Sequence, residues 1–206
     1  MSQSAPSSQF DRLTQIAAAL SRAAVWVGGS LTLASVFLIC FDVIARKFFG
    51  YTVGGADELS SYAFAISTTW SLAFALMQRA NVRVDVIYQL FSPRIAAIVD
   101  WFAIVALSVF IVMLTRYAFE VVNTSVIQRS AANTPLATPL WIPQGLWFVG
   151  LCWMVVVLAL MLLRASLALV KGDVGIVHHL IGVRTSIEEA QEEAEAGERM
   201  VRGDRP

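Results

Sequence analysis

Four long apolar stretches dominate the pattern of hydrophobic and charged positions along this chain of 206 residues. Charged residues bound each stretch, and Asp100, in the third, is the only charge inside any of them. At a rise of 1.5 Å per residue, about 20 helical residues cross the roughly 30 Å of hydrocarbon in a bilayer. All four reach about that length: residues 23–41, 59–78, 95–115 and 130–163. The pattern therefore predicts an all-α membrane protein with four transmembrane helices.

The predicted spans form one transmembrane domain of residues 23–165, with spans at about 23–45, 59–78, 95–115 and 144–163. The apolar pattern of the third span continues to residue 127. A helix of that extent is about 50 Å long and must tilt or project from the membrane. Three prolines between residues 135 and 143 exclude a regular helix before the fourth span. The remaining residues, 166–206, form a polar and acidic tail.

Two shorter segments combine an apolar stripe with polar residues, which is typical of helices that lie at a membrane surface. The first, over residues 10–21, belongs to an N-terminal region of residues 1–22. The second, over residues 82–91, connects the second and third spans and ends at Ser92-Pro93. We therefore expect short interfacial amphipathic helices beside the four spans, with the lipid bilayer as a partner.

The middle of the second span is unusually polar, because it reads Ser-Thr-Thr-Trp-Ser over residues 67–71. Small hydroxyl side chains let helices approach closely and hydrogen-bond across the contact. This face is therefore predicted to pack against protein and not against lipid. Two pairs with i,i+4 spacing, Asp42 with Arg46 and Arg116 with Glu120, are expected at the water boundary.

Basic residues near the span ends favour one orientation, since cytoplasmic loops carry more lysine and arginine than outer loops. With the N-terminus inside, eight basic residues lie near the inner ends of the spans and four near the outer ends. Both termini are therefore expected in the cytoplasm. The inner set is Arg12, Arg22, Arg79, Arg83, Arg94, Arg164, Lys171 and Arg184, and the outer set is Arg46, Lys47, Arg116 and Arg129.

Composition and charge exclude several classes of protein. Hydrophobic residues make up 57% of the chain and charged residues 15%, against about 25% charged in an average soluble domain. With a mean hydropathy of +0.67, these values exclude a disordered chain. The 15 basic and 15 acidic residues balance, so no excess positive charge points to nucleic acid. Cys40 and Cys152 both lie inside apolar spans, so they form neither a disulfide framework nor a redox pair.

The sequence contains no motif for catalysis or for a cofactor. His178 and His179 are its only histidines and lie beyond the fourth span, whereas a haem-binding membrane anchor needs axial ligands within its spans. Walker, HExxH and GxSxG motifs are absent. We therefore expect no enzyme activity, no cofactor and no bound metal. A membrane anchor for a redox enzyme stays a third alternative, which a haem or quinone signature would favour.

Asp100 is the one candidate for a charged group in a membrane pathway, because charges inside spans often mark ion or substrate routes. Two interpretations stay open. Asp100 is either a coupling carboxylate or an interfacial acid that pairs with Arg94 or Arg22. The first interpretation suits a self-contained small transporter or channel that works as a homo-oligomer. The second suits a chain that serves as part of a larger assembly.

The stretch from Arg46 to Ile87 resembles the small, DctQ-like membrane subunit of tripartite ATP-independent periplasmic (TRAP) transporters. That family shows an arginine at the end of its first helix, an acidic pair at the start of the second, and a later arginine followed by a Val-Asp-containing segment. Ala56 and Asn81 depart from the family's usual tryptophan and histidine. The matching positions are Arg46, Asp57, Glu58, Arg79, Val82, Arg83, Val84 and Asp85.

The four-span layout, and the loop over 134–143 followed by Gly150, also resemble the family, so that the likeness covers about residues 23–165. The resemblance implies a bacterial inner-membrane subunit that supports a large membrane subunit and helps to dock a periplasmic substrate-binding protein. In such systems a sodium gradient drives uptake of an organic anion such as a carboxylate, and the sodium and substrate sites belong to the large subunit. It also implies structural and interface roles for Arg46, Asp57, Glu58, Arg79, Arg83 and Asp85.

Overall fold

The computed structural model describes residues 7–79, 91–173, 175, 180, 181, 194 and 197 of the chain. Its helices are α1 (Ser7–Phe49), α2 (Ala56–Met77), α4 (Pro93–Ile127) and α5 (Trp141–Val170). Each of the four is long and apolar enough to cross a membrane. The prediction of an all-α protein with four membrane-spanning helices is therefore confirmed.

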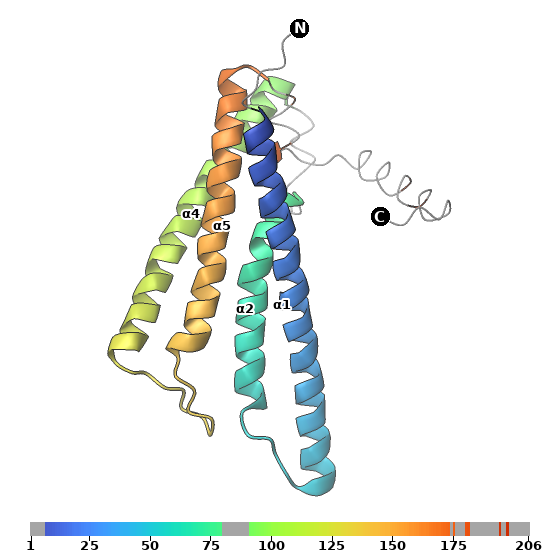
Figure 1. Ribbon diagram of the computed structural model, residues 1–206, viewed down its shortest axis with the longest axis vertical. Coiled ribbons are helices and arrows are strands. Elements are labelled where there is room, and N and C mark those ends of the chain that lie inside the picture. Colours follow the sequence, from blue (N-terminus) through green and yellow to red (C-terminus); the bar gives the residue numbers. More distant parts are fainter. Residues whose placement is uncertain are drawn as a thin grey trace.

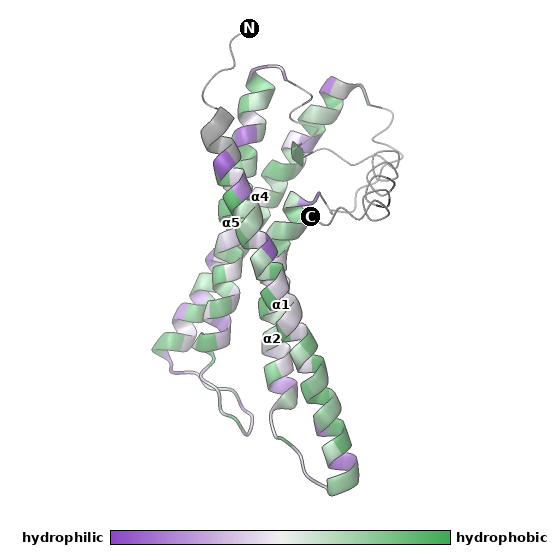
Figure 2. Ribbon diagram, turned by 45° about the vertical axis from the view of Figure 1, so that its right-hand side comes forward, coloured by the Kyte–Doolittle hydropathy of each residue, from purple (hydrophilic) through white to green (hydrophobic). Residues whose placement is uncertain are grey.

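The helices form two antiparallel hairpins, α1–α2 and α4–α5, which contact each other mainly through α2 and α5 (Figure 1). We call the end where α1 begins and α5 ends the terminal end. At the opposite end, the loop end, residues 50–55 and 128–140 connect the helices of each hairpin. The two hairpins separate toward the loop end (Figure 1), and apolar residues make up most of their length (Figure 2).

Helix α1 is continuous over 43 residues and has no break near residue 22. The prediction of a separate surface helix over residues 10–21 is therefore wrong. The physical reason is that no glycine or proline interrupts residues 10–27, so the helix propagates through them. Tertiary contacts hold this first part as well, because Ala17 is buried in the core. The second predicted surface helix, over 82–91, lies outside the described residues except for Phe91.

The third span continues to residue 127, as the apolar pattern predicts, since α4 has 35 residues and is about 52 Å long. Helix α5 begins at Trp141 and ends at Val170, so it is longer at both ends than the predicted span 144–163. Pro143 does not prevent the early start, because proline is tolerated in the first turn of a helix. At the other end Gly172 stops the helix with a φ of 72°.

The hydrophobic core lies mainly between α4 and α5. On α4 its members recur every seven residues, at Ala97, Ile104 and Ile111. A seven-residue repeat keeps one seam of a helix against its neighbour and is typical of coiled-coil packing. On α5 the members Met154 and Met161 show the same spacing. The two helices therefore pack as an antiparallel pair, to which α4 contributes this one seam of core residues.

Arg129, just after α4, has a φ of 49°, which is the left-handed region. It caps the helix, because the next amide, Ser130 N, donates to Ser125 O at 3.0 Å. A non-glycine residue in this conformation costs about 1 kcal/mol. The Arg129→Gly variant should therefore raise the free energy of unfolding by about 1 kcal/mol, measured by thermal denaturation in detergent. Gln128→Gly, at φ −82°, should lower it, and the opposite order would contradict this explanation.

Candidate interface and the contacts that shape it

Residues 67–71, the polar segment in the middle of α2, pack against α1 at Gly28. The Ser67 hydroxyl donates to the Gly28 carbonyl oxygen at 2.7 Å, and the Thr32 hydroxyl donates to Ser67 Oγ at 3.0 Å. A Cβ atom on Gly28 would lie 3.1 Å from Ser67 Cα, so the absence of a side chain allows this close approach. Gly29, by contrast, has nothing within 4 Å of its Cβ position.

The same segment packs against α5 at Gly150. A Cβ atom on Gly150 would lie 2.6 Å from Trp70 Cδ1 and 2.7 Å from Thr69 Oγ1. The Trp70 indole N–H donates to Leu146 O at 2.9 Å, one turn earlier on α5. The predicted packing of residues 67–71 against protein is confirmed for the buried Ser67 and Thr69, whereas Thr68 is exposed. Helix α2 therefore holds a neighbour on each side, α1 and α5.

Further hydrogen bonds join the helices nearer the terminal end. The indole N–H of Trp153 on α5 donates to Ser21 Oγ on α1 at 3.0 Å. Arg164 Nη1 on α5 donates to Thr14 Oγ1 at 3.0 Å, also on α1. In a medium without water such bonds satisfy polar groups that would otherwise be unpaired. They fix the first turns of α1 beside α5 and account for the continuation of α1 beyond the expected span.

Asp42 is buried at the loop end and organises the α1–α2 loop. It pairs with Arg46 Nη2, as the i,i+4 spacing predicts. It also accepts hydrogen bonds from Thr52 Oγ1 at 2.9 Å and from the Val53 amide at 2.8 Å. Arg46 is largely exposed and makes this ion pair to Asp42. The second predicted pair, between Arg116 and Glu120 on α4, is present with an N–O distance of 2.6 Å.

Glu58 is buried at the start of α2 and joins the two hairpins. Its carboxylate accepts hydrogen bonds from Tyr62 OH at 2.8 Å and from the Thr134 hydroxyl in the α4–α5 loop. Beside it, Leu136 packs so closely on Gly55 that its side chain occupies the space where a Cβ atom on the glycine would lie. We call Gly55, Glu58, Thr134 and Leu136 the loop-end clasp. It fixes the α4–α5 loop against α2 at the end where the hairpins separate.

The other family-motif positions lie apart from the clasp. Asp57 is exposed beside Glu58. Arg79 lies just beyond the end of α2 with a φ of 55°. Arg83 and Asp85 lie outside the described residues. The six candidates therefore include two that take part in buried contacts at the loop end, Arg46 through Asp42 and Glu58 directly.

Asp100 is buried in α4, with 1% of its surface exposed, and makes a polar interaction. Its place, two turns from the start of α4, is near the terminal end. The pairing with Arg94 or Arg22 stays a prediction. The choice between a coupling carboxylate and a paired structural acid is likewise a matter for experiment.

A pocket of about 210 Å³ lies between α1, α2 and α5. The indole N–H groups in its wall belong to Trp70 and Trp153, and both are already engaged in hydrogen bonds. No charged residue lines it, so it lacks the groups that would bind an organic anion. Among the residues described, no cluster of three His, Cys, Asp or Glu could hold a metal ion. The lining residues are Leu20, Ala24, Trp70, Val149, Gly150 and Trp153.

Sequence reasoning missed the partners that complete these contacts. Gly28 and Gly29 are adjacent and identical, and nothing local distinguishes the one that meets Ser67. Thr134 and Leu136 lie far from Glu58 along the chain, and only the packing of the hairpins brings them together. The polarity of residues 67–71 is the one signal in the sequence for the contacts that α2 makes with its two neighbours.

Comparison with family models gives a match over residues 35–168, which is more than half of the chain. The matching family is described as tripartite ATP-independent periplasmic transporters, DctQ component. Comparison with curated proteins and with solved structures gives no significant match. The family match covers about the last third of α1, all of α2 and α4, and nearly all of α5.

Proposed function

Because the chain belongs to the DctQ family of TRAP transporter components, we propose that it supports the large membrane subunit and helps to dock the periplasmic substrate-binding protein. The complex would use a sodium gradient to take up an organic anion, such as a carboxylate, across the bacterial inner membrane. The chain itself is a multi-pass membrane protein and the small permease subunit of such a transporter. On this proposal it has no enzyme activity of its own.

One observation carries the proposal: the buried carboxylates at the loop end bind side chains and loops of this chain itself. Asp42 is occupied by Arg46 and the α1–α2 loop, and Glu58 by Tyr62 and the α4–α5 loop. Carboxylates whose lone pairs are already used this way are poor sites for a coupling ion. A chain built in this manner suits a fixed support against which a partner moves. Sodium and substrate would then bind in the large subunit.

The proposed orientation places the terminal end in the cytoplasm and the loop end in the periplasm. Arg12, Arg22, Arg94 and Lys171 are exposed toward the terminal end, and Arg164 lies with them. This bias supports a cytoplasmic terminal end, because positive charge is retained inside. The clasped loops would then face the compartment of the binding protein.

The supporting role can be tested by deleting the gene for this chain, so that the native membrane lacks it. We expect the amount of the large subunit in the membrane to fall about tenfold, because its supporting surface is lost. Quantitative mass spectrometry of membrane fractions measures this, and re-expression of the chain should restore the level. An unchanged large subunit that still transports would contradict the role.

A further inference from the structure

The four helices differ in the residues that they expose. On α4 between residues 95 and 115, and on α5 between residues 141 and 163, every exposed residue is apolar. On α2 three of the five exposed residues between 57 and 77 are polar, and α2 is also the least hydrophobic span. Polar groups that face hydrocarbon are costly. The exposed residues of α2 are Asp57, Leu59, Ser61, Phe64 and Thr68.

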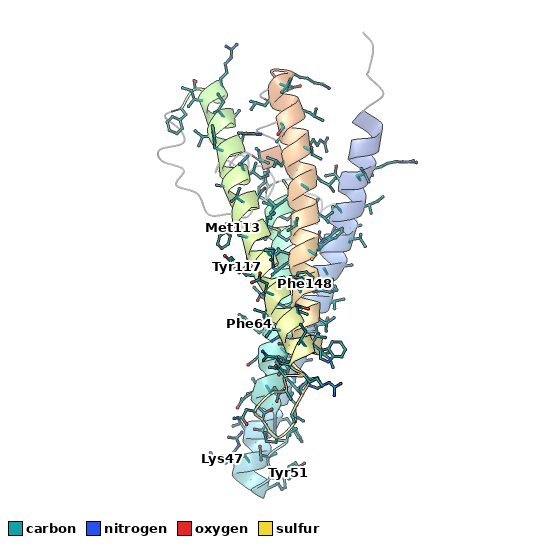
Figure 3. The ribbon with its side chains drawn as sticks, turned by 90° about the vertical axis from the view of Figure 1, so that its left-hand side faces the viewer. Lys47, Tyr51, Phe64, Met113, Tyr117 and Phe148 are labelled. Carbon is teal, nitrogen blue, oxygen red and sulfur yellow. The ribbon has the colours of Figure 1, made fainter. Side chains whose placement is uncertain are left out.

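Four of these residues form one stripe along α2. Asp57, Ser61, Phe64 and Thr68 follow the spacing i, i+4, i+7 and i+11, which places them on a single face of a helix. The flanks of α2 are occupied, since Ser67 meets α1 and Thr69 meets α5. We call the four residues the α2 stripe. Figure 3 shows its Phe64 at a level close to Phe148 and Tyr117, within the helical part of the molecule.

The α2 stripe presents hydrogen-bond acceptors and no free donors. Ser61 Oγ donates to Asp57 O and Thr68 Oγ1 donates to Phe64 O, each at 2.8 Å. A hydroxyl has one proton, so each oxygen keeps only its lone pairs for a further partner. The Asp57 carboxylate is an acceptor as well. Within the described part of the chain, no basic side chain lies within ion-pair distance of it.

We propose that the α2 stripe binds a membrane-spanning helix of the large permease subunit. That helix would carry small residues and donor side chains opposite Ser61 and Thr68, and a basic side chain opposite Asp57 at the loop end. Lipid tails offer no donors to the stripe. A second copy of this chain, placed stripe against stripe, would set acceptors against acceptors and carboxylate against carboxylate. The inference rests on the proposed function and adds to it the surface and the chemistry of the partner.

Tryptophan substitutions on the α2 stripe test the proposal. Ser61→Trp and Thr68→Trp add bulk to the stripe and remove its two hydroxyl acceptors. We expect the large subunit recovered with the tagged chain in mild detergent to fall on the order of tenfold. Leu33→Trp is the matched control, because Leu33 is 58% exposed on α1 and apolar. It should leave recovery unchanged.

The outcomes separate this inference from the proposed function. If the unmodified chain and Leu33→Trp recover the large subunit and the stripe variants recover it equally well, the assigned surface is wrong while the role stands. If the unmodified chain recovers no large subunit, the proposed function itself fails.

A labelling experiment covers the case in which a tryptophan variant is unstable by itself. Ser61→Cys is made in a chain that carries Cys40→Ser and Cys152→Ser, and is treated with N-ethylmaleimide. We expect rapid labelling of the isolated chain and protection in the complex, whereas Lys47→Cys, at an exposed position in the last turn of α1, should label in both. Equal labelling of Ser61→Cys in both states, or a disulfide between two copies of this chain, would overturn the proposal.

Discussion

The Gly150→Leu variant should lose the close contact between α2 and α5, with a fall of about 1–3 kcal/mol in the free energy of unfolding. Even the first carbon of the new side chain would lie 2.6 Å from Trp70 Cδ1 and 2.7 Å from Thr69 Oγ1. Neither neighbour can move freely, because the indole of Trp70 is bonded to Leu146 O and Thr69 is buried. Thermal denaturation of the purified chain in detergent, followed by tryptophan fluorescence, measures the loss.

Gly145→Leu is the control for this variant. It lies five residues earlier on the same helix and has nothing within 4 Å of its Cβ position. Stability should therefore not fall, and should rise by up to about 1 kcal/mol, because glycine is a poor helix former. Equal losses of stability at the two positions would show that leucine destabilises α5 for some reason other than the crossing with α2. No loss at Gly150 would show that α2 and α5 do not cross there.

The Glu58→Ala variant should release the α4–α5 loop from α2. It leaves the hydroxyls of Tyr62 and Thr134 without their charged acceptor. Amide hydrogen exchange over residues 131–138 should become faster by about tenfold or more, since local opening is no longer opposed by the clasp. The variant should also assemble less with the large subunit, while the complex that does form keeps its affinity for substrate.

Glu120→Ala provides the comparison for Glu58→Ala. Glu120 is also a carboxylate in contact with a neighbouring side chain, but its pair with Arg116 is exposed on one helix. Its removal should leave exchange in the loop and assembly unchanged, because exposed ion pairs contribute little. Normal assembly of Glu58→Ala together with an altered substrate affinity would contradict a structural role for Glu58.

The helices could be predicted from the sequence because the signal is local. A charge-free stretch long enough to cross a bilayer sets the span, as in α2, and the continuing apolar pattern extends α4 to residue 127. The pair between Asp42 and Arg46 follows from their spacing alone. The polarity of residues 67–71 indicated a protein contact for the same reason.

The relative placement of the helices could not be predicted in this way. Helices α4 and α5 carry mostly apolar residues on all their faces. Hydropathy therefore does not distinguish the buried seam through Ile104 from the faces toward lipid. Glu58 meets Thr134 only after both hairpins have formed and packed. The placement of the first part of α1 beside α5 depends on contacts with Trp153 and Arg164, more than a hundred residues away. These features arise from long-range packing, which no short window of sequence encodes.

The most direct test of the central claim is to isolate the tagged chain from its native membrane in mild detergent and identify what accompanies it by mass spectrometry. We expect a large polytopic permease subunit in a fixed ratio to this chain. A homo-oligomer without such a partner would contradict the account. If such an oligomer also carried an ion flux that Asp100→Asn abolished, the chain would instead be a self-contained transporter or channel.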